Sequence, residues 1–313
     1  MNGADPMAAE PGSVVVTGAS RGLGLASAAH LYRLGWTVVA VMRSPDSGVE
    51  RLRELTGAQP GDSRLVAVRM DLDDRDSIAR GAAEVVEAVG APDVVVHNAG
   101  VAGVGAVEEM PTAVYDQIFS TNLFGPILLT KALLPAMRAA GRGRIVVVSS
   151  QGGVSGMPGI SAYSAAKGAL ERWAEALAPE IAPFGLGVSV LVTGTFKTDI
   201  LELTTSYADP DGPYAAMHEA LEAMEPRVQR LAARPERFAH GLSKALGDTA
   251  PFARHAVGPD AHVVLVASRV LPTWLFQRLV GRALGLPRPG SLQHGPERFA
   301  PVTPYSERGT NDG

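Results

Sequence analysis

The chain alternates short apolar runs with longer segments whose apolar residues recur at helical spacing. The runs are apolar almost throughout, which is typical of strands that helices cover on both faces. Six runs rich in Val and Ile cover residues 13–18, 37–43, 64–71, 92–100, 143–150 and 187–194. Glycines lie where the helices between them are expected to end, at Gly35, Gly90, Gly141 and Gly185. The pattern predicts an α/β fold with one doubly wound parallel sheet between two helical layers, a Rossmann fold.

This pattern predicts a single domain over residues 13–285. Residues 1–12 are expected to form a disordered lead, and residues 286–313, rich in Pro, Gly and polar side chains, a disordered tail. Within the domain, residues 197–250 are expected to form a helical lid over the substrate, with a mobile loop at 204–213 and a helix at 235–247. A last short strand is expected near 254–258.

Composition excludes several classes of protein. The net charge of -4 and the absence of basic runs argue against nucleic acid as a partner. Without cysteine there is no disulfide and no thiolate, and the seven histidines lack the paired spacing of zinc sites, so no metal is expected. No signal peptide pattern is found at the N-terminus, and we expect a cytoplasmic protein.

The apolar stretch 262–286 is interrupted by Arg269, Pro272, Arg278 and Arg282, which argues against a membrane span. It predicts a packed C-terminal helix, with a helix lying on a membrane surface as the alternative.

A glycine-rich turn follows the first apolar run, in the sequence TGASRGLG at 17–24. Gly18, Gly22 and Gly24 would allow a tight turn whose backbone N–H groups approach a phosphate at the start of the next helix. The second run ends at Arg43, where a guanidinium suits a 2′-phosphate better than two ribose hydroxyls, and Arg21 adds a second cation. We therefore predict NADP(H) over NAD(H) as the cofactor; the alternative is two ordinary surface arginines.

Tyr163 and Lys167 are four residues apart in the sequence YSAAK and would share one helix face. Ser150 ends the fifth run, 13 residues before the tyrosine. By itself the pair could be a solvated lysine beside a half-buried tyrosine.

Taken in series, four motifs resemble the short-chain dehydrogenase/reductase family in its single-domain type. They are the Thr-Gly-x-x-x-Gly-x-Gly turn, NAG at 98–100, SS at 149–150 and YSAAK at 163–167. The resemblance implies an oxidoreductase that interconverts an alcohol and a ketone or aldehyde.

The family implies roles for the matching residues. Tyr163 would be the general acid/base, and the positive charge of Lys167 would lower the phenol pKa while the lysine holds the nicotinamide ribose. Ser150, favoured over Ser149 by spacing, would hold the substrate carbonyl. Asn122 would complete a proton relay through a water.

The family also implies cofactor contacts along the carboxyl edge of the sheet, among which Asp71 would contact the adenine and Asn98 would steady the central strands. The expected contacts are Gly18, Ser20, Arg21, Gly22, Leu23, Gly24, Arg43, Asp71, Leu72, Asn98, Ala99, Gly100, Tyr163, Lys167, Gly194, Phe196 and Thr198. Two positions depart from the pattern. His97 replaces a common asparagine, and Thr193 replaces a usual proline, which predicts a less rigid loop. Phe196 in that loop is expected to partly close the nicotinamide pocket.

Within the family, the sequence looks most like the hydroxysteroid and retinol dehydrogenase branch, which implies a lipophilic substrate. The expected substrate residues are Ser150, Val154, Met157, Tyr163 and Phe196, with Ile200 and Leu203 also in the candidate pocket, although such apolar side chains could be simple core.

Alternative functions are a catalytically silent dinucleotide sensor and an NAD-preferring dehydrogenase of a small polar alcohol. The glycine spacing argues against a lyase or epimerase of the extended branch. The resemblance also implies a homodimer or homotetramer, formed through the fourth and fifth helices.

Overall fold

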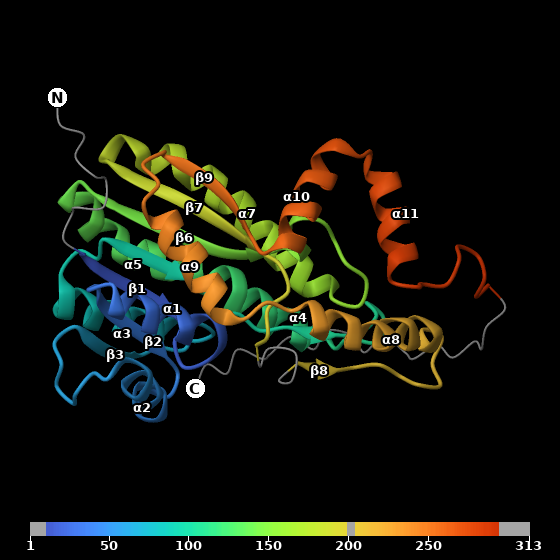
Figure 1. Ribbon diagram of the computed structural model, residues 1–313, viewed down its shortest axis with the longest axis horizontal. Coiled ribbons are helices and arrows are strands. Elements are labelled where there is room, and N and C mark those ends of the chain that lie inside the picture. The colour runs from blue at the N-terminus through green and yellow to red at the C-terminus, as the bar shows by residue number, and fades with distance from the viewer. Residues whose placement is uncertain (1–10, 199–203, 294–313) are drawn as a thin grey trace, which may run out of the picture.

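The computed structural model describes residues 11–198 and 204–293, and these form a three-layer α/β/α sandwich (Figure 1). Its central sheet has seven parallel strands in the order β3-β2-β1-β4-β6-β7-β9. The strands are β1 (Ser13–Thr17), β2 (Thr37–Met42), β3 (Leu65–Arg69), β4 (Val94–His97), β6 (Gly143–Ser150), β7 (Leu186–Thr193) and β9 (Phe252–Val257). This confirms the predicted doubly wound sheet.

Three helices cover each face of the sheet. On one face lie α1 (Gly22–Arg33), α2 (Pro45–Thr56) and α9 (Pro235–Leu246), which share a core with the Val side chains of β1 and β2. On the other lie α3 (Arg75–Val89), α5 (Gly125–Ala140) and α7 (Ser161–Ile181). Because both faces are covered, the strands need apolar residues at nearly every position, which is why their sequences read as continuous runs.

The long helix Thr112–Ala140 is interrupted by a π turn. Helix α4 (Thr112–Phe119) continues through η1 (Ser120–Phe124) into α5 without leaving helical geometry. By length and composition the whole helix Thr112–Ala140 could cross a membrane. Its apolar side chains Leu129, Leu133 and Met137 are fully buried against the sheet, so the apolar composition is explained by packing.

The remaining elements gather at the carboxyl edge of the sheet. They are β5 (Gly103–Val104), α6 (Gln151–Val154), β8 (Thr205–Ser206), α8 (Ala215–Leu231), α10 (Pro259–Val270) and α11 (Thr273–Ala283), whereas the 3-10 turn η2 (Ala182–Phe184) lies at the opposite edge, just before β7 begins. In Figure 1, α8 and β8 lie on one side of this edge and α10 and α11 project from the other. A parallel pair, β5 with β8, stands where the sequence predicted only a loop.

The structure describes only part of the predicted terminal segments. Residues 286–293 follow α11, and the Leu286 N–H donates to the Gly281 carbonyl at 2.9 Å. Residues 1–10 and 294–313, expected to be disordered, lie outside the described residues, so that expectation stays a prediction.

Candidate active site

The glycine-rich turn joins β1 to α1 and requires glycine for two different reasons. Gly18 and Gly22 have φ values of 68° and 54°, in the left-handed region. A Cβ on Gly24 would lie 2.2 Å from the Gly18 carbonyl oxygen, so the turn could not close around a larger residue. No side chain of the described residues caps the N-terminus of α1. Its backbone N–H groups are therefore suited to a phosphate.

Thr17 and Asn98 tie this turn to the end of β4. The Thr17 hydroxyl donates to the Val96 carbonyl at 3.2 Å and accepts from the backbone N–H groups of Asn98 at 3.0 Å and Ala99 at 3.1 Å. The Asn98 amide donates back to the Thr17 carbonyl at 2.8 Å. This agrees with the predicted steadying role of Asn98. Sequence reasoning gave Thr17 no role of its own, although it begins the glycine motif.

The two arginines proposed to hold a 2′-phosphate lie at the same edge. The Ala19 N–H donates to the Val41 carbonyl at 3.2 Å, so the ends of β1 and β2 are joined just before Arg21 and Arg43. Both side chains are exposed and form no ion pair with any described residue. Two unpaired cations thus remain available beside the glycine turn.

Asp71 and Leu72 follow β3, an outermost strand of the sheet, at its carboxyl edge. The Asp71 carboxylate accepts from the Asp73 N–H at 3.1 Å, and the Asp71 backbone N–H donates to the Ser77 hydroxyl. Leu72 is buried against Gly125, where a Cβ would come within 2.8 Å of the leucine side chain.

Ser150 and Tyr163 meet where β6 ends and α7 begins. The Ser150 hydroxyl accepts the Gly152 N–H at 3.2 Å and is hydrogen-bonded to the Tyr163 phenol. Burial raises the pKa of Tyr163, and the hydrogen bond from Ser150 opposes that rise only in part. The net direction is therefore opposite to the predicted lowering of the phenol pKa, because burial outweighs the hydrogen bond with Ser150. A phenol of raised pKa is protonated at neutral pH.

Lys167 lies one turn further along α7. Its ammonium donates to the Val148 carbonyl at 2.8 Å and lies 5.8 Å from the centre of the Tyr163 ring. The residue is only 3% exposed. Burial lowers the pKa of Lys167 to about 8, while the Glu171 carboxylate acts to raise it. The simple alternative of a solvated lysine does not describe this geometry.

Ser149 points away from this group. Its hydroxyl donates to the buried Glu171 carboxylate at 2.5 Å. Of the two serines that close β6, the structure thus brings Ser150 next to Tyr163.

Asn122 lies in the π turn and is fully buried. Its side-chain oxygen accepts the Val101 N–H at 2.8 Å, and its amide donates to the Val101 carbonyl at 2.8 Å. A Cβ on Gly100 would lie 3.3 Å from the Asn122 oxygen and 3.5 Å from the Lys167 ammonium, so the three residues converge. The side chain is fully engaged with backbone, and the expected water relay stays a prediction.

The loop after β7 is held by hydrogen bonds in place of the missing proline. The Thr193 hydroxyl donates to the Ser149 carbonyl at 2.8 Å, and the Thr195 N–H donates to the Asp260 carboxylate at 2.6 Å. Both hydrogen bonds hold the start of this loop, and the predicted loss of rigidity stays a prediction. A Cβ on Gly194 would lie 1.8 Å from the Asp260 oxygen, which explains the glycine there.

Further along the same loop, Thr198 meets the glycine turn. Its side chain would lie 3.5 Å from a Cβ on Gly22, so the loop after β7 reaches the turn after β1.

Phe196 does not close a pocket. Its side chain is 5% exposed and packs edge-on against Phe238 of α9, with ring centres 5.8 Å apart, in the core beneath β1. The prediction that Phe196 lines the nicotinamide and substrate pockets is corrected accordingly. Ile200 and Leu203, the other loop residues expected in that pocket, lie outside the described residues.

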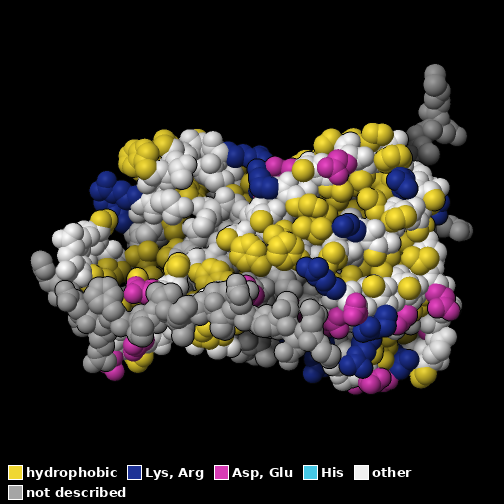
Figure 2. Space-filling view, turned by 180° about the vertical axis from the view of Figure 1, so that it is seen from behind, with side chains coloured by type: hydrophobic (Ala, Val, Ile, Leu, Met, Phe, Trp, Pro, Cys, Tyr) yellow, Lys and Arg dark blue, Asp and Glu magenta, His cyan; other side chains and the backbone are white. Residues whose placement is uncertain are grey.

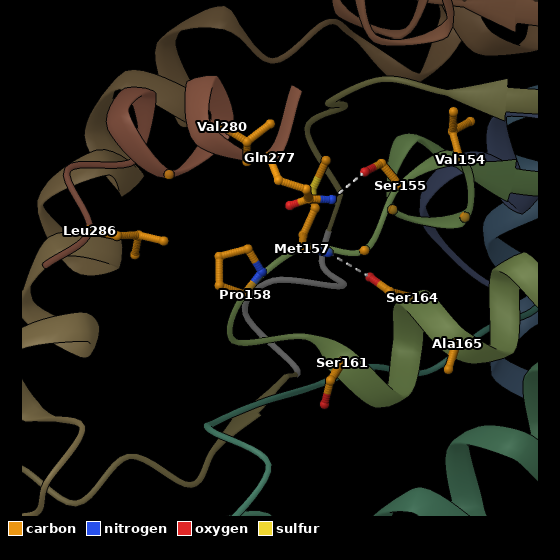
Figure 3. A pocket seen from close by; sticks show the side chains of 14 residues that line it. Val154, Ser155, Met157, Pro158, Ser161, Ser164, Ala165, Gln277, Val280 and Leu286 are labelled. Carbon is orange, nitrogen blue, oxygen red and sulfur yellow. Dashed lines mark hydrogen bonds between the residues drawn. The ribbon is translucent and has the colours of Figure 1, made fainter. Parts of the chain in front are cut away.

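A cavity of about 570 Å³ lies between α11 and the segment that connects β6 to α7 (Figure 3). Val154 and Met157, which the sequence predicts to contact the substrate, line it together with Val280 and Leu286 from the C-terminal part. Their role toward a substrate stays a prediction. The Gln277 amide donates to the Ser155 hydroxyl at 2.9 Å across the cavity. Neither Ser150 nor Tyr163 lines it, although Gly152, which does, would bring a Cβ within 3.7 Å of the Tyr163 ring. The cavity therefore adjoins the Tyr163 site rather than containing it.

Among the described residues, no group of three or more His, Asp or Glu side chains could hold a metal ion.

Comparison with known proteins agrees with this geometry. A model of the short chain dehydrogenase family matches residues 13–208. The 3-ketodihydrosphingosine reductase of Bacteroides thetaiotaomicron is 30% identical over 281 residues, which cover 88% of this chain and 97% of the relative.

Two solved structures are also similar. A short-chain dehydrogenase from Streptomyces avermitilis superposes with a TM-score of 0.73 at 34% identity, covering 89% of this chain and 98% of its own. A metagenomic short-chain oxidoreductase in complex with NADP has a TM-score of 0.61 at 28% identity, covering 78% of this chain and 96% of its own.

Proposed function

Since the chain belongs to the short-chain dehydrogenase/reductase family, and is therefore an oxidoreductase, we propose that it reduces the carbonyl group of a lipophilic ketone or aldehyde with NADPH, and catalyses the reverse oxidation. The observation that carries the proposal is the convergence of Ser150, Tyr163 and Lys167 at the carboxyl edge of the sheet. Nicotinamide sites of doubly wound sheets lie at this edge.

In the proposed reaction the bound NADPH supplies the hydride that reaches the carbonyl carbon. Ser150 and Tyr163 both hydrogen-bond the carbonyl oxygen, which orients the carbonyl group and stabilises the negative charge that develops on the oxygen. The Tyr163 phenol then donates its proton to that oxygen, which yields the alcohol. A phenol whose pKa burial has raised is protonated at neutral pH, which supports the reductive direction.

The preference for NADP(H) over NAD(H) rests on Arg21 and Arg43. Both are exposed beside the glycine turn without a carboxylate partner among the described residues, and a guanidinium pairs well with a phosphate. The turn itself fits a dinucleotide, since its glycines leave the start of α1 open to a pyrophosphate.

The lipophilic substrate is supported by the cavity beside the site. Val154, Met157, Val280 and Leu286 give it an apolar lining. One relative, by its name, reduces 3-ketodihydrosphingosine. We propose that the apolar part of the substrate extends from Tyr163 into this cavity.

The test is to mix the purified protein with NADPH or NADH and a panel of ketones and aldehydes of increasing apolar length, and to follow absorbance at the reduced nicotinamide band. The proposal expects turnover with NADPH that improves with apolar length. Tight NADPH binding without turnover of any carbonyl would favour the silent sensor. Turnover confined to NADH and short polar substrates would favour the small-alcohol dehydrogenase.

We also propose a cytoplasmic homodimer or homotetramer. Figure 2 shows apolar side chains gathered on the side opposite to that of Figure 1, with few charged side chains among them. On the helix that includes α5, Phe124 is 51% exposed. Light scattering on the purified protein measures the mass, and a monomer at micromolar concentration would contradict the proposal.

A further inference from the structure

A buried carboxylate, that of Glu171, lies next to the proposed catalytic residues on α7. Glu171 follows Lys167 by four residues on α7, as Lys167 follows Tyr163, so the three lie along one face of the helix. Glu171 is only 1% exposed. Burying an unpaired carboxylate destabilises the folded protein, so a buried glutamate is tolerated only where partners pair with it.

The partners of Glu171 come from two strands of the sheet. One carboxylate oxygen accepts the Ser149 hydroxyl of β6 at 2.5 Å, and the other pairs with the Arg254 guanidinium of β9. Ser149 directly precedes Ser150, so the hydrogen bond fixes the end of the strand that presents Ser150 to the substrate. Glu171 thus joins the helix of Tyr163 to the strand of Ser150.

Gly153 shows how tightly this region is packed. A Cβ on Gly153 would lie 2.5 Å from the Ser149 hydroxyl and 2.9 Å from a Glu171 oxygen. Helix α6 therefore closes over the pair, and only glycine fits there.

We propose that Glu171 is a positioning residue of the active site: its carboxylate fixes Ser149, and through it Ser150, and provides the counter-charge for the Lys167 ammonium. This inference rests on the proposed function, because it assigns Ser150 and Lys167 their roles in carbonyl reduction.

The Glu171 charge acts on Lys167 among several other ionisable groups. Burial lowers the pKa of Lys167 to about 8, and Glu171 is the group that counteracts it. His97 of β4 also faces Lys167, but burial holds the pKa of His97 at about 3, so its ring is neutral. Burial raises the pKa of Glu171 itself, and the Ser149 hydrogen bond and the charges of Arg254 and Arg172 oppose that rise, while Glu175 adds to it. Without the Glu171 charge, Lys167 would lose its proton at a lower pH.

A direct test reads the titration of Lys167 itself. The chain has four lysines, and the other three, Lys131, Lys197 and Lys244, are exposed. Protein labelled with ¹³C at the lysine ε-carbon should show one resonance with a midpoint near pH 8, assigned by its loss in Lys167→Arg. In Glu171→Gln that midpoint should move to lower pH. The matched control is Glu175→Gln, one turn further along α7, which should leave it unchanged.

Activity provides the second measurement. Since an opposite charge at close range is worth about a tenfold change in a proton equilibrium, kcat/KM of Glu171→Gln should fall about tenfold relative to wild type at pH 8, and less at pH 6.5. Ser149→Ala removes the hydrogen bond but keeps the charge. It should lower kcat at every pH without moving the Lys167 midpoint.

If Glu171→Gln does not fold because Arg254 is left unpaired, the double variant Glu171→Met with Arg254→Met removes both charges and should move the Lys167 midpoint in the same direction by a smaller amount. An unchanged Lys167 midpoint, or an equal shift in Glu175→Gln, would overturn the inference. A wild-type protein that reduces no carbonyl would refute the proposed function instead, and the lysine titration would still decide the role of Glu171.

Discussion

Asp260, at the start of α10, accepts a 2.6 Å hydrogen bond from the backbone N–H of Thr195, in the loop that follows β7. The same carboxylate lies against Gly194 and within 3.4 Å of the Gln151 amide. One side chain of the C-terminal part thus fixes the loop that reaches the glycine turn through Thr198. In the proposed complex this loop contacts the cofactor.

Replacing Asp260 should therefore weaken cofactor binding more than it slows the chemical step. A hydrogen bond to a charged acceptor is worth about 1.5–3 kcal/mol, so Asp260→Ala should raise KM for NADPH roughly tenfold or more with a smaller change in kcat. Asp260→Asn keeps an oxygen acceptor and should recover most of the affinity. The control is Glu236→Ala, an exposed acidic residue in the first turn of α9. Equal KM values in all three variants would contradict this role.

Tyr163→Phe removes the proton donor and keeps the ring. General acid catalysis contributes about 10²–10⁴ in rate, so kcat should fall by that factor. NADPH affinity, measured by fluorescence titration, should stay within about twofold because the phenyl ring still fills its place. Turnover close to the wild-type rate would show that the assigned mechanism is wrong.

Arg43→Asp should shift cofactor preference toward NADH. The variant loses a cation beside the proposed 2′-phosphate site and gains a carboxylate that can accept from ribose hydroxyls. We expect the kcat/KM for NADPH, divided by that for NADH, to fall by roughly tenfold to a hundredfold, because this factor corresponds to the loss of one charge-assisted hydrogen bond. Arg51→Asp, an exposed site within α2, controls for net charge. The same ratio in wild type and Arg43→Asp would rule out Arg43 as the specificity residue.

Lys167→Met should abolish activity and stabilise the fold at neutral pH. The lowering of the Lys167 pKa from 10.5 to about 8 corresponds to about 3 kcal/mol of destabilisation by the buried ammonium. Because the unfolded chain holds this proton up to pH 10.5 and the folded one only to about 8, the penalty is fully present below pH 8. It is relieved as pH rises from 8 to 10.5, where wild-type stability gains relative to the variant.

Urea unfolding of wild type and Lys167→Met at pH 7 and pH 10 measures this difference, with Lys244→Met as the exposed control. The loss of the hydrogen bond to Val148 offsets part of the gain. A variant that is less stable than wild type at pH 7, or a difference that does not change with pH, would contradict the prediction.

Filling the cavity beside the active site should discriminate between substrates by length. Met157→Trp places a larger ring among Val154, Val280 and Leu286. Ketones with long apolar tails should lose about tenfold or more in kcat/KM, since overpacking costs about 1–3 kcal/mol, while short ketones should be little affected. The control is Leu231→Trp at a site that is 80% exposed. An equal loss for short and long ketones would place the tail elsewhere.

The sheet and the proposed catalytic residues were accessible to sequence reasoning for a physical reason. Strands buried on both faces must be apolar throughout, and the spacing of Tyr163 and Lys167 on a helix is fixed by its pitch. The strand pair β5 and β8 was missed because two residues in each strand carry no periodicity.

The errors arose where the outcome depends on which neighbours pack around a side chain. Phe196 has the loop position of a pocket residue, but its ring turns to Phe238 of α9, 42 residues away in the chain. The hydrogen bond from the Thr193 hydroxyl to the Ser149 carbonyl was also hidden from the local sequence, because it depends on the register of β6 with β7. The pKa of Tyr163 depends on burial, which no local motif encodes.

The hydrogen bonds between Thr17 and Asn98 join positions that are 81 residues apart. A chain emerging from the ribosome has the glycine turn long before it has the strand that steadies it. The turn therefore lacks this partner until residue 98 has been synthesised. The dinucleotide proposed as the cofactor would bind the folded chain in preference to the unfolded one, and would then stabilise the fold as well as take part in the reaction.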